Sequence, residues 1–182
     1  MIDVLDQEIL KILQEDGRMS NKELAYKVGL AQSATSERLR KLRERGWIEK
    51  FEIRLDAARL GFGLVAFIFV RTQELVSGRK IGDQLAAIEE AQEVFNVAGE
   101  DCYLVKVRVK DPEALGKLLR DKIGVIDSVV TTRTTIVMET YKETCKLPLS
   151  QLGANGSSNI RSTTSAASKN GPAGRGAGAT LR

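Results

Sequence analysis

The chain has 182 residues, of which 42% are hydrophobic, 5% aromatic and 29% charged. This composition is typical of a soluble globular protein of one or two domains. Histidine is absent and the only cysteines are Cys102 and Cys145, which excludes Ser-His-Asp and Cys-His catalysis, histidine-containing metal sites and a four-cysteine zinc site. We therefore expect no enzyme activity, no bound metal and no cofactor.

The net charge of +4 is concentrated at the end of the sequence, because residues 151–182 hold four cations and no acidic residue. Overall basicity is therefore no evidence that the rest of the chain binds nucleic acid, and a case for binding must rest on local patterning. Residues 151–182 consist mainly of Gly, Ser, Thr, Ala and Asn. We expect this low-complexity tail to be disordered, since it cannot bury enough apolar surface to offset its conformational entropy.

The longest uninterrupted apolar run is residues 64–70, which is too short to span a bilayer. The first residues lack the basic-then-apolar layout of a secretory signal. We therefore expect a cytoplasmic protein that makes no contact with a membrane.

Two short helices are predicted at the start of the chain. The first ends at Gly17 and carries an apolar stripe with the spacing of one helix face: Leu5, Ile9, Ile12 and Leu13. The second begins at Ser20, where Ser20 and Glu23 form a capping box. Gly29 ends it as a C-terminal cap.

A third helix is predicted over residues 32–45, with an inward face made of Thr35, Leu39 and Leu42. Residues 47–53 then alternate with a period of two, as a half-buried strand does, which places Trp47 in the core. Three helices, a tight turn at residues 29–31 and a following strand are typical of a winged helix-turn-helix. We assign residues 1–60 to this DNA-binding domain and its linker strand.

In a helix-turn-helix, the second helix of the pair lies in the major groove of DNA. The outward face of the third helix begins with small polar residues that permit close approach, and it carries Gln32, Ser33, Ser36 and Arg40. Gln can bind adenine and Arg can bind guanine through paired hydrogen bonds. Further cations lie nearby and are suited to phosphates, although cations near a helix C-terminus also favour the macrodipole. The predicted DNA-binding residues are Gln32, Ser33, Ser36, Arg38, Arg40, Lys41 and Arg43.

Residues 61–150 are predicted to form a second domain, in which β-branched runs alternate with amphipathic helices. The elements expected in chain order are strand 64–70, a helix around residues 81–88, strands 93–98 and 103–109, a helix from Pro112 and strand 129–141. The order β-α-β-β-α-β is that of a ferredoxin-like unit. The predicted fold class is therefore α+β.

The first strand of this domain is apolar on both of its faces, with Val65, Phe67 and Phe69 on one and Ala66, Ile68 and Val70 on the other. Two helices can cover only one face of a four-stranded sheet. A second copy of the chain is the simplest cover for the other face, and a homodimer suits DNA sites made of two half-sites.

The chain resembles the Lrp/AsnC family of leucine-responsive (feast/famine) transcription regulators over about residues 3–145. The matching N-terminal motifs are Leu5-Asp6-x-x-Ile9-Leu10-x-x-Leu13-x-x-Asp16-Gly17-Arg18, Leu24-Ala25-x-x-Val28-Gly29-Leu30 and Glu37-Arg38-Leu39-Arg40-x-Leu42-x-x-x-Gly46-x-Ile48. In the second domain they are Gly99-Glu100-Asp101-Cys102-Tyr103 and Thr132-Arg133-Thr134-x-Ile136-Val137-Met138-Glu139.

The resemblance implies an amino-acid-sensing second domain and dimers that assemble further, often to octamers. It places a small effector between dimers, at positions that here are Gly99, Glu100, Asp101, Cys102, Thr132, Thr134 and Thr135. A carboxylate can pair with an α-ammonium group, and threonine hydroxyls can hold an α-carboxylate. A plain β-hairpin turn is the alternative interpretation of residues 99–103, since Gly and Asp are common in turns.

This chain departs from the family pattern at three places. Cys102 stands where members often have Asp, and Asp127-Ser128-Val129 replaces a Pro-Gly-Val turn. Ala31 stands where the third helix usually has a Ser cap, and Ala cannot supply a capping oxygen.

The predicted function is that of a transcription regulator that binds double-stranded DNA sequence-specifically. Its assembly and its affinity for DNA are expected to respond to a small effector, for which an amino acid is the favoured class. Such a regulator would associate with the nucleoid when it binds DNA. Two other functions agree less well with the residues. Similar proteins decarboxylate a tetrapyrrole but rely on histidines, which are absent here, and a sensor without DNA binding would not need the cations between Arg38 and Arg45.

Overall fold

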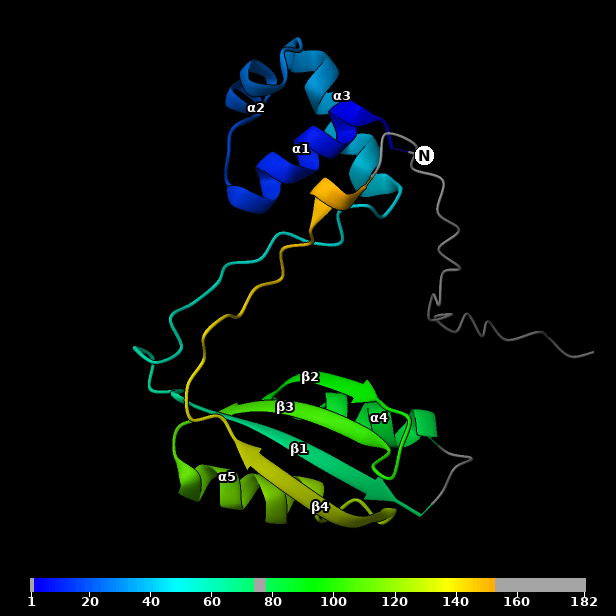
Figure 1. Ribbon diagram of the computed structural model, residues 1–182, viewed down its shortest axis with the longest axis vertical. Helices are drawn as coiled ribbons and strands as arrows, with labels where there is room; N and C mark the ends of the chain where they lie inside the picture. Colours follow the sequence, from blue (N-terminus) through cyan, green and yellow to red (C-terminus); the bar gives the residue numbers. More distant parts are fainter. Residues whose placement is uncertain (1, 74–77, 153–182) are drawn as a thin grey trace, which may run out of the picture. The chain divides into compact units, whose positions relative to one another are not determined.

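The computed structural model describes residues 2–73 and 78–152 (Figure 1). The predicted disorder of the tail concerns residues that, from residue 153 onward, lie outside the described chain. The structure divides into two compact units. One comprises Met1–Glu49 together with the chain from Lys146 onward, and the other comprises Lys50–Cys145.

The three predicted helices of the first unit are confirmed as α1 (Val4–Glu15), α2 (Asn21–Val28) and α3 (Gln32–Glu44). Ser20 caps α2 in the predicted capping box with Glu23. Gly29 ends α2 with a φ of 68°, in the left-handed region where Gly is favoured. Ala31 precedes α3 and gives it no side-chain cap, as the sequence indicated.

The core of the first unit is formed where the three helices meet. Ile9 and Leu24 are fully buried there, and they pack with Val28 and Leu42. Thr35 is also fully buried, and its hydroxyl donates a hydrogen bond to the carbonyl oxygen of Ala31 over 3.2 Å. This bond satisfies the buried hydroxyl, so a polar residue on the inward face of α3 does not carry an unpaired group.

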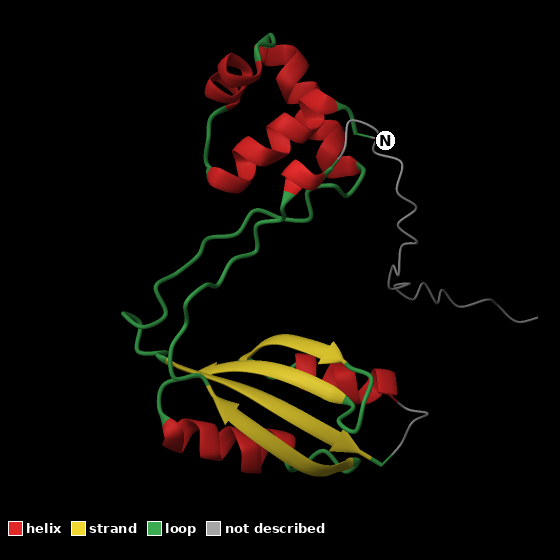
Figure 2. Ribbon diagram, viewed as in Figure 1, coloured by secondary structure: helices red, strands yellow, loops and turns green. Residues whose placement is uncertain are grey.

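The strand predicted over residues 47–53 is wrong for the described chain, which has loop structure between α3 and the second unit (Figure 2). A strand needs a neighbour for its backbone hydrogen bonds, and no described segment pairs with residues 47–53. The core position predicted for Trp47 is also wrong, because 46% of its surface is exposed. Ile48 does follow the prediction in part, since it is half-buried against the helical core.

A segment from the far end of the chain completes the first unit. The backbone of Leu147 makes two hydrogen bonds with the side chain of Gln14 on α1, with N–O distances of 2.7 and 3.2 Å. Lys146 pairs with Glu15 at 2.6 Å. A short 3-10 turn, η2 (Leu149–Gln151), follows. Residues 146–152 are called the return segment below.

The second unit contains a four-stranded antiparallel sheet with the spatial order β2-β3-β1-β4. Its elements are β1 (Leu64–Thr72), α4 (Gly78–Ala86), β2 (Ala91–Asn96), β3 (Tyr103–Val109), α5 (Pro112–Leu118), the π-helical turn η1 (Leu119–Ile123) and β4 (Val129–Ile136). The predicted order β-α-β-β-α-β is confirmed, and Pro112 occupies the first turn of α5 as expected.

The hydrophobic core of this unit lies between the sheet and its helices. On β1, Ala66, Ile68 and Val70 are fully buried and belong to one cluster with α4 and α5 residues such as Leu85 and Leu118. The alternate residues of β1 face the other side of the sheet, which we call the open face. Phe67 and Phe69 on this face are only half-buried.

The last strand is shorter than predicted, since β4 ends at Ile136 and not at residue 141. Ile136 is opposite Ala66, close to the start of β1, and the amide of Val137 donates to the carbonyl of Val65. β1 itself begins at Leu64, but its first two residues are in register only with β3, so the β4 pairing ends before β1 does. Residues 138–142 are accordingly exposed, with Met138 94% exposed.

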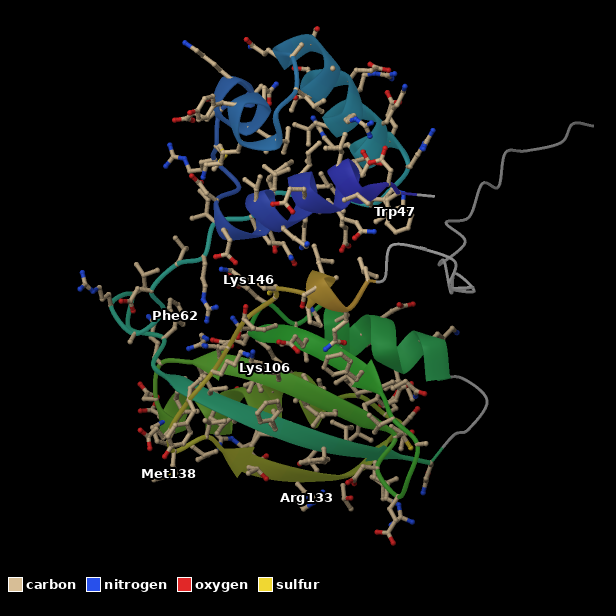
Figure 3. The ribbon with its side chains drawn as sticks, turned by 45° about the horizontal axis from the view of Figure 1, so that its top comes forward. Trp47, Phe62, Lys106, Arg133, Met138 and Lys146 are labelled. Carbon is tan, nitrogen blue, oxygen red and sulfur yellow. The ribbon has the colours of Figure 1, made fainter. Side chains whose placement is uncertain are left out.

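Glu143 joins three segments of the second unit through one carboxylate. It pairs with Lys106, with Arg108 at 3.1 Å and with Arg54 at 3.1 Å. Figure 3 shows Lys106 on β3, where only 12% of its side chain is exposed and where it also pairs with Glu93 at 2.9 Å. A cation this well covered requires close anions, so the Glu143 pairing offsets the loss of hydration at Lys106.

Replacing Glu143 by Gln should change how stability depends on pH. The ion pair with Lys106 lowers the pKa of Glu143 from its ordinary value of 4.5. A carboxylate with a lowered pKa stabilises the fold above its unfolded pKa and loses that contribution as the pH falls through the lower folded pKa. Urea unfolding is measured from neutral pH to well below 4.5. The free energy of unfolding should fall less with decreasing pH in Glu143→Gln than in the wild type. Glu139→Gln, on the same stretch of chain, is the matched control, and an acid profile equal to that of the wild type in Glu143→Gln would contradict the prediction.

Candidate functional site

The orientation of α3 is set by its buried side. Thr35 and Leu42 are buried and Leu39 is half-buried, so the opposite side of the helix faces solvent. Among the predicted DNA-binding residues, Gln32, Ser33, Arg40, Lys41 and Arg43 are exposed. Ser36 is half-buried, and its hydroxyl accepts a hydrogen bond from Asn21 at the start of α2 over 3.2 Å.

Arg40 lies on the outward side of α3 between two glutamates. It pairs with Glu37 at 2.7 Å and with Glu44 at 2.5 Å, and Lys41 also pairs with Glu37 at 3.3 Å. Hydrogen bonds from Arg40 and Lys41 lower the pKa of Glu37 to about 2. The outward face therefore carries both signs of charge, and its cations Arg40 and Lys41 are paired with neighbouring anions while exposed to solvent.

Arg38 lies on a different side of α3 from Ser33 and Arg40, and Lys41 is its neighbour one turn later. One nitrogen of its guanidinium, Nη1, donates to Asp3 at 2.6 Å and to Asp6 at 2.8 Å, both at the start of α1. About a third of the Arg38 side chain is exposed, at 31%. The side-chain hydrogen bonds to Asp3 and Asp6 raise the pKa of Arg38.

The residues predicted to hold an effector lie near one end of the sheet of the second unit. Gly99 has a φ of 139° in the β2–β3 turn. The amide of Cys102 donates to the carbonyl of Val70 over 3.0 Å, which fixes the end of this turn beside β1. Thr132 is opposite Val70 on the other side of β1, so the turn and Thr132 lie at the same end of the sheet.

The three predicted threonines do not share one face. Thr132 and Thr134 are opposite Val70 and Ile68, whose side chains face the helices. Thr135 is opposite Phe67 and shares the open face with it. A single small molecule on the helix side of the sheet could therefore contact Thr132 and Thr134 but not the side chain of Thr135.

Two residues at this end of the sheet were missed by the sequence analysis. Arg133 stacks on the ring of Phe69, with 3.9 Å from its guanidinium carbon to the ring centroid, and it pairs with Asp101 at 3.1 Å (Figure 3). Thr72 has a buried hydroxyl oxygen with no hydrogen-bond partner among the described residues. Their roles depend on which residues lie opposite each other in the sheet, and no sequence motif marks that register.

Thr72 is also where the β1–β4 pairing becomes irregular, since the register shifts between Arg71 and Thr72. The carbonyl of Thr72 lies 3.9 Å from Sγ of Cys102, so the end of β1 and the β2–β3 turn are in contact here. Irregular pairing of this kind is common beside functional sites because it reorients side chains. The buried unpaired hydroxyl marks this end of β1 as a place where a polar partner is missing among the described residues.

Residues 2–73 and 78–152 contain no group of three or more Cys, Asp or Glu side chains placed to hold a metal ion. None of the helices over the same residues is long and apolar enough to cross a bilayer.

Comparison with protein families assigns both units. Residues 2–49 match the model of a winged helix-turn-helix DNA-binding domain. Residues 65–147 match the model of the Lrp/AsnC ligand binding domain. The first match covers α1–α3, and the second covers the sheet with α4 and α5.

Individual relatives agree with this assignment. The HTH-type transcriptional regulator FL11 of Pyrococcus horikoshii is 41% identical over 150 residues, which cover 81% of this chain and 97% of that protein. The leucine-responsive regulatory protein of Escherichia coli K12 is 34% identical over 148 residues, covering 80% of this chain and 90% of that protein.

Solved structures show the same architecture. A transcriptional regulator from Neisseria meningitidis, solved in complex with L-Met, has a TM-score of 0.79 and 29% identity, covering 84% of this chain and 99% of that one. E. coli AsnC has a TM-score of 0.74 and 26% identity, covering 79% and 96%. The chain therefore belongs to the Lrp/AsnC family of transcription regulators, with an N-terminal helix-turn-helix DNA-binding domain and a C-terminal ligand-binding domain of α+β fold.

Proposed function

We propose that the chain recognises specific sequences in double-stranded DNA through the outward side of α3. The observation that carries this proposal is the exposed polar and cationic face at Gln32, Ser33 and Arg40, which follows a turn of the length found in helix-turn-helix domains. Gln32 and Arg40 have the hydrogen-bonding groups to contact base edges. Lys41 and Arg43 would contact phosphates, which contribute affinity and salt dependence but little specificity.

The charge pairs on this face affect how DNA would be bound. Arg40 must exchange Glu37 and Glu44 for a guanine or a phosphate, so each contact replaces an existing ion pair. Glu37 and Glu44 would then lie close to the DNA backbone, where their charges oppose non-specific binding. Such an arrangement favours sequences that supply good partners for Arg40 over sequences that offer only phosphates.

A small effector is proposed to bind at the end of the sheet that holds the β2–β3 turn. The unpaired Thr72 hydroxyl and the hydroxyls of Thr132 and Thr134 offer groups for an amino acid on the helix side of the sheet. The carboxylate of Asp101, in the same turn, would have to leave its ion pair with Arg133 on the open face to contact that ligand. The structurally similar regulator from Neisseria meningitidis was solved in complex with L-Met, which supports an amino acid as the effector. Glu100 and Cys102 belong to the same turn, whereas Thr135 faces the other side of the sheet and would contact a ligand only through its backbone.

We also propose a homodimer formed through the open face. Phe67 and Phe69 are half-buried there, and Phe95 is 46% exposed on β2 of the same face. A second copy would remove these rings from water without a change of fold. Dimers of this kind would assemble further, to octamers, and act in the cytoplasm at the nucleoid. In this proposal the chain acts as a regulator and not as an enzyme, in line with the regulator names of its relatives.

The proposed function is tested by fluorescence anisotropy with a DNA duplex from upstream of the gene that encodes this chain. Excess unrelated DNA is present at fixed salt, and the titration is run with and without a mixture of the common amino acids. Saturable binding whose midpoint shifts with the mixture is expected, because effector and DNA affinities are coupled through the same assembly. A second duplex, selected by the chain from a random-sequence pool, guards against a wrong choice of operator. Failure to select any duplex would refute DNA recognition, and selection that ignores every amino acid would refute the effector proposal.

Replacing Arg40 by Ala should weaken specific DNA binding without changing the oligomer. The side chain is exposed and points away from the core, so its loss should leave the fold intact. Loss of one good base contact lowers affinity by roughly tenfold. Lys11→Ala removes an exposed cation from α1 and serves as the matched control. An Arg40→Ala chain that binds DNA like the wild type, or one that unfolds, would show that this face is assigned incorrectly.

Replacing Thr72 by Val should stabilise the free chain and weaken the response to the effector. Val has nearly the same shape as Thr but lacks the hydroxyl that is buried without a partner. Removing such a group relieves a desolvation cost of about 1 kcal/mol. Thermal unfolding should therefore occur at a higher temperature, and a larger concentration of the active amino acid should be needed to shift DNA binding. Thr131→Val, at an exposed position of β4, is the control. An unchanged effector response in Thr72→Val would remove Thr72 from the site.

A further inference from the structure

Arg38 is bound to both carboxylates of one helix cap. Asp3 is the N-cap residue of α1, and its Oδ1 accepts from the amide of Asp6 at 2.8 Å. Asp6 in turn uses Oδ2 to accept from the amide of Asp3 at 3.2 Å. Each carboxylate therefore uses one oxygen for the cap and has the other left over, and both remaining oxygens accept from Nη1 of Arg38, at 2.6 and 2.8 Å.

This arrangement solves an electrostatic problem at the start of α1. A capping box made of two aspartates holds two negative charges side by side. The positive end of the helix dipole compensates them only in part. The guanidinium of Arg38 supplies the remaining positive charge. The backbone hydrogen bond from Asp6 and the bonds from Arg38 together lower the pKa of Asp3.

The direction of the Arg38 side chain separates it from the DNA-binding face. Successive residues of an α-helix are about 100° apart, so Arg38 and Arg40 lie about 200° apart around α3. Arg38 is three residues after the buried Thr35 and four before the buried Leu42, which places it beside the core-facing stripe. Only 14% of the Asp6 side chain is exposed, so this end of the contact is nearly covered.

We propose that Arg38 is a positioning residue, which fixes the rotation and tilt of α3 against α1, and that it does not contact DNA. The apolar contacts of Leu42 and its neighbours are non-directional, whereas charge-assisted hydrogen bonds from one nitrogen to two oxygens have a defined geometry. A small rotation of α3 would move Gln32, Ser33 and Arg40 together out of register with the bases. This inference rests on the DNA-binding face proposed above, and it changes the role of Arg38 from a phosphate contact to a support of that face.

The test uses the full chain, the duplex selected from the random pool and the two variants Arg38→Ala and Asp6→Asn. Both should lower specific affinity on the order of tenfold, because the base contacts are misaligned. The slope of log affinity against log salt should stay at the wild-type value in both, since no phosphate contact is lost. Lys41→Ala is the matched control on the same helix, and its slope should fall by about 0.9.

Asp6→Asn separates the two possible roles of Arg38 most clearly. Asn keeps the size of Asp and can still accept the capping bond, but it removes one of the two anions that hold Arg38, and Asp3 keeps the other. If Arg38 were a DNA contact held back by Asp6, this change would free it and DNA would bind more tightly. Tighter binding by Asp6→Asn, or a slope lower by about 0.9 in Arg38→Ala, would overturn the inference.

Folding is checked by circular dichroism and thermal unfolding before each titration. If Arg38→Ala does not fold, the sign of the Asp6→Asn effect decides the question alone. Failure of the wild-type chain to select any duplex would count against the proposed DNA-binding face. That outcome is distinct from the inference about Arg38, which predicts differences between variants of a chain that binds.

Discussion

The second unit depends on the central position of β1, which pairs with β3 on one side and β4 on the other. Because β1 is apolar on both faces, it requires a cover on each, and α4 and α5 supply only one. The same strand ends at the irregular pairing of Thr72, next to Cys102 and close to Thr132, so the strand that organises the core also brings the proposed effector residues together. The packing of the core, the proposed dimer and the proposed effector site are thus linked through one strand.

Local signals in the sequence were sufficient for most of the helices and for the order of strands. Capping residues such as Ser20 and Gly29 act within a few positions of the element they define, and the alternation of β3 is visible without knowledge of its neighbours. The errors came where structure depends on a partner. Residues 47–53 alternate as a strand does but have no neighbouring strand in the described chain, and β4 ends opposite Ala66, where its pairing with β1 stops.

The candidate site shows the same division. The exposed positions of α3 follow from helical periodicity, so Gln32, Ser33 and Arg40 could be selected from sequence alone. Arg38 and Arg133 could not be understood in that way, because their partners Asp3, Asp6 and Asp101 lie more than 30 positions away in the chain. Charge pairs of this kind depend on the packing of whole elements. A basic stripe in a sequence therefore indicates a charged helix but does not say which cations are already bound within the protein.

The return segment means that the first unit acquires its last contacts only after the second unit has been synthesised. Its contacts join Gln14 and Glu15 on α1 to residues 133 and 131 positions later, after the whole second unit in the chain. On the ribosome the three helices emerge first, yet their final contacts await the last strand of the other unit. A chain whose synthesis stops early would thus carry a helix-turn-helix that lacks the cover on α1. The first unit is therefore synthesised before the second unit, but its contacts are completed only after the second unit has been synthesised.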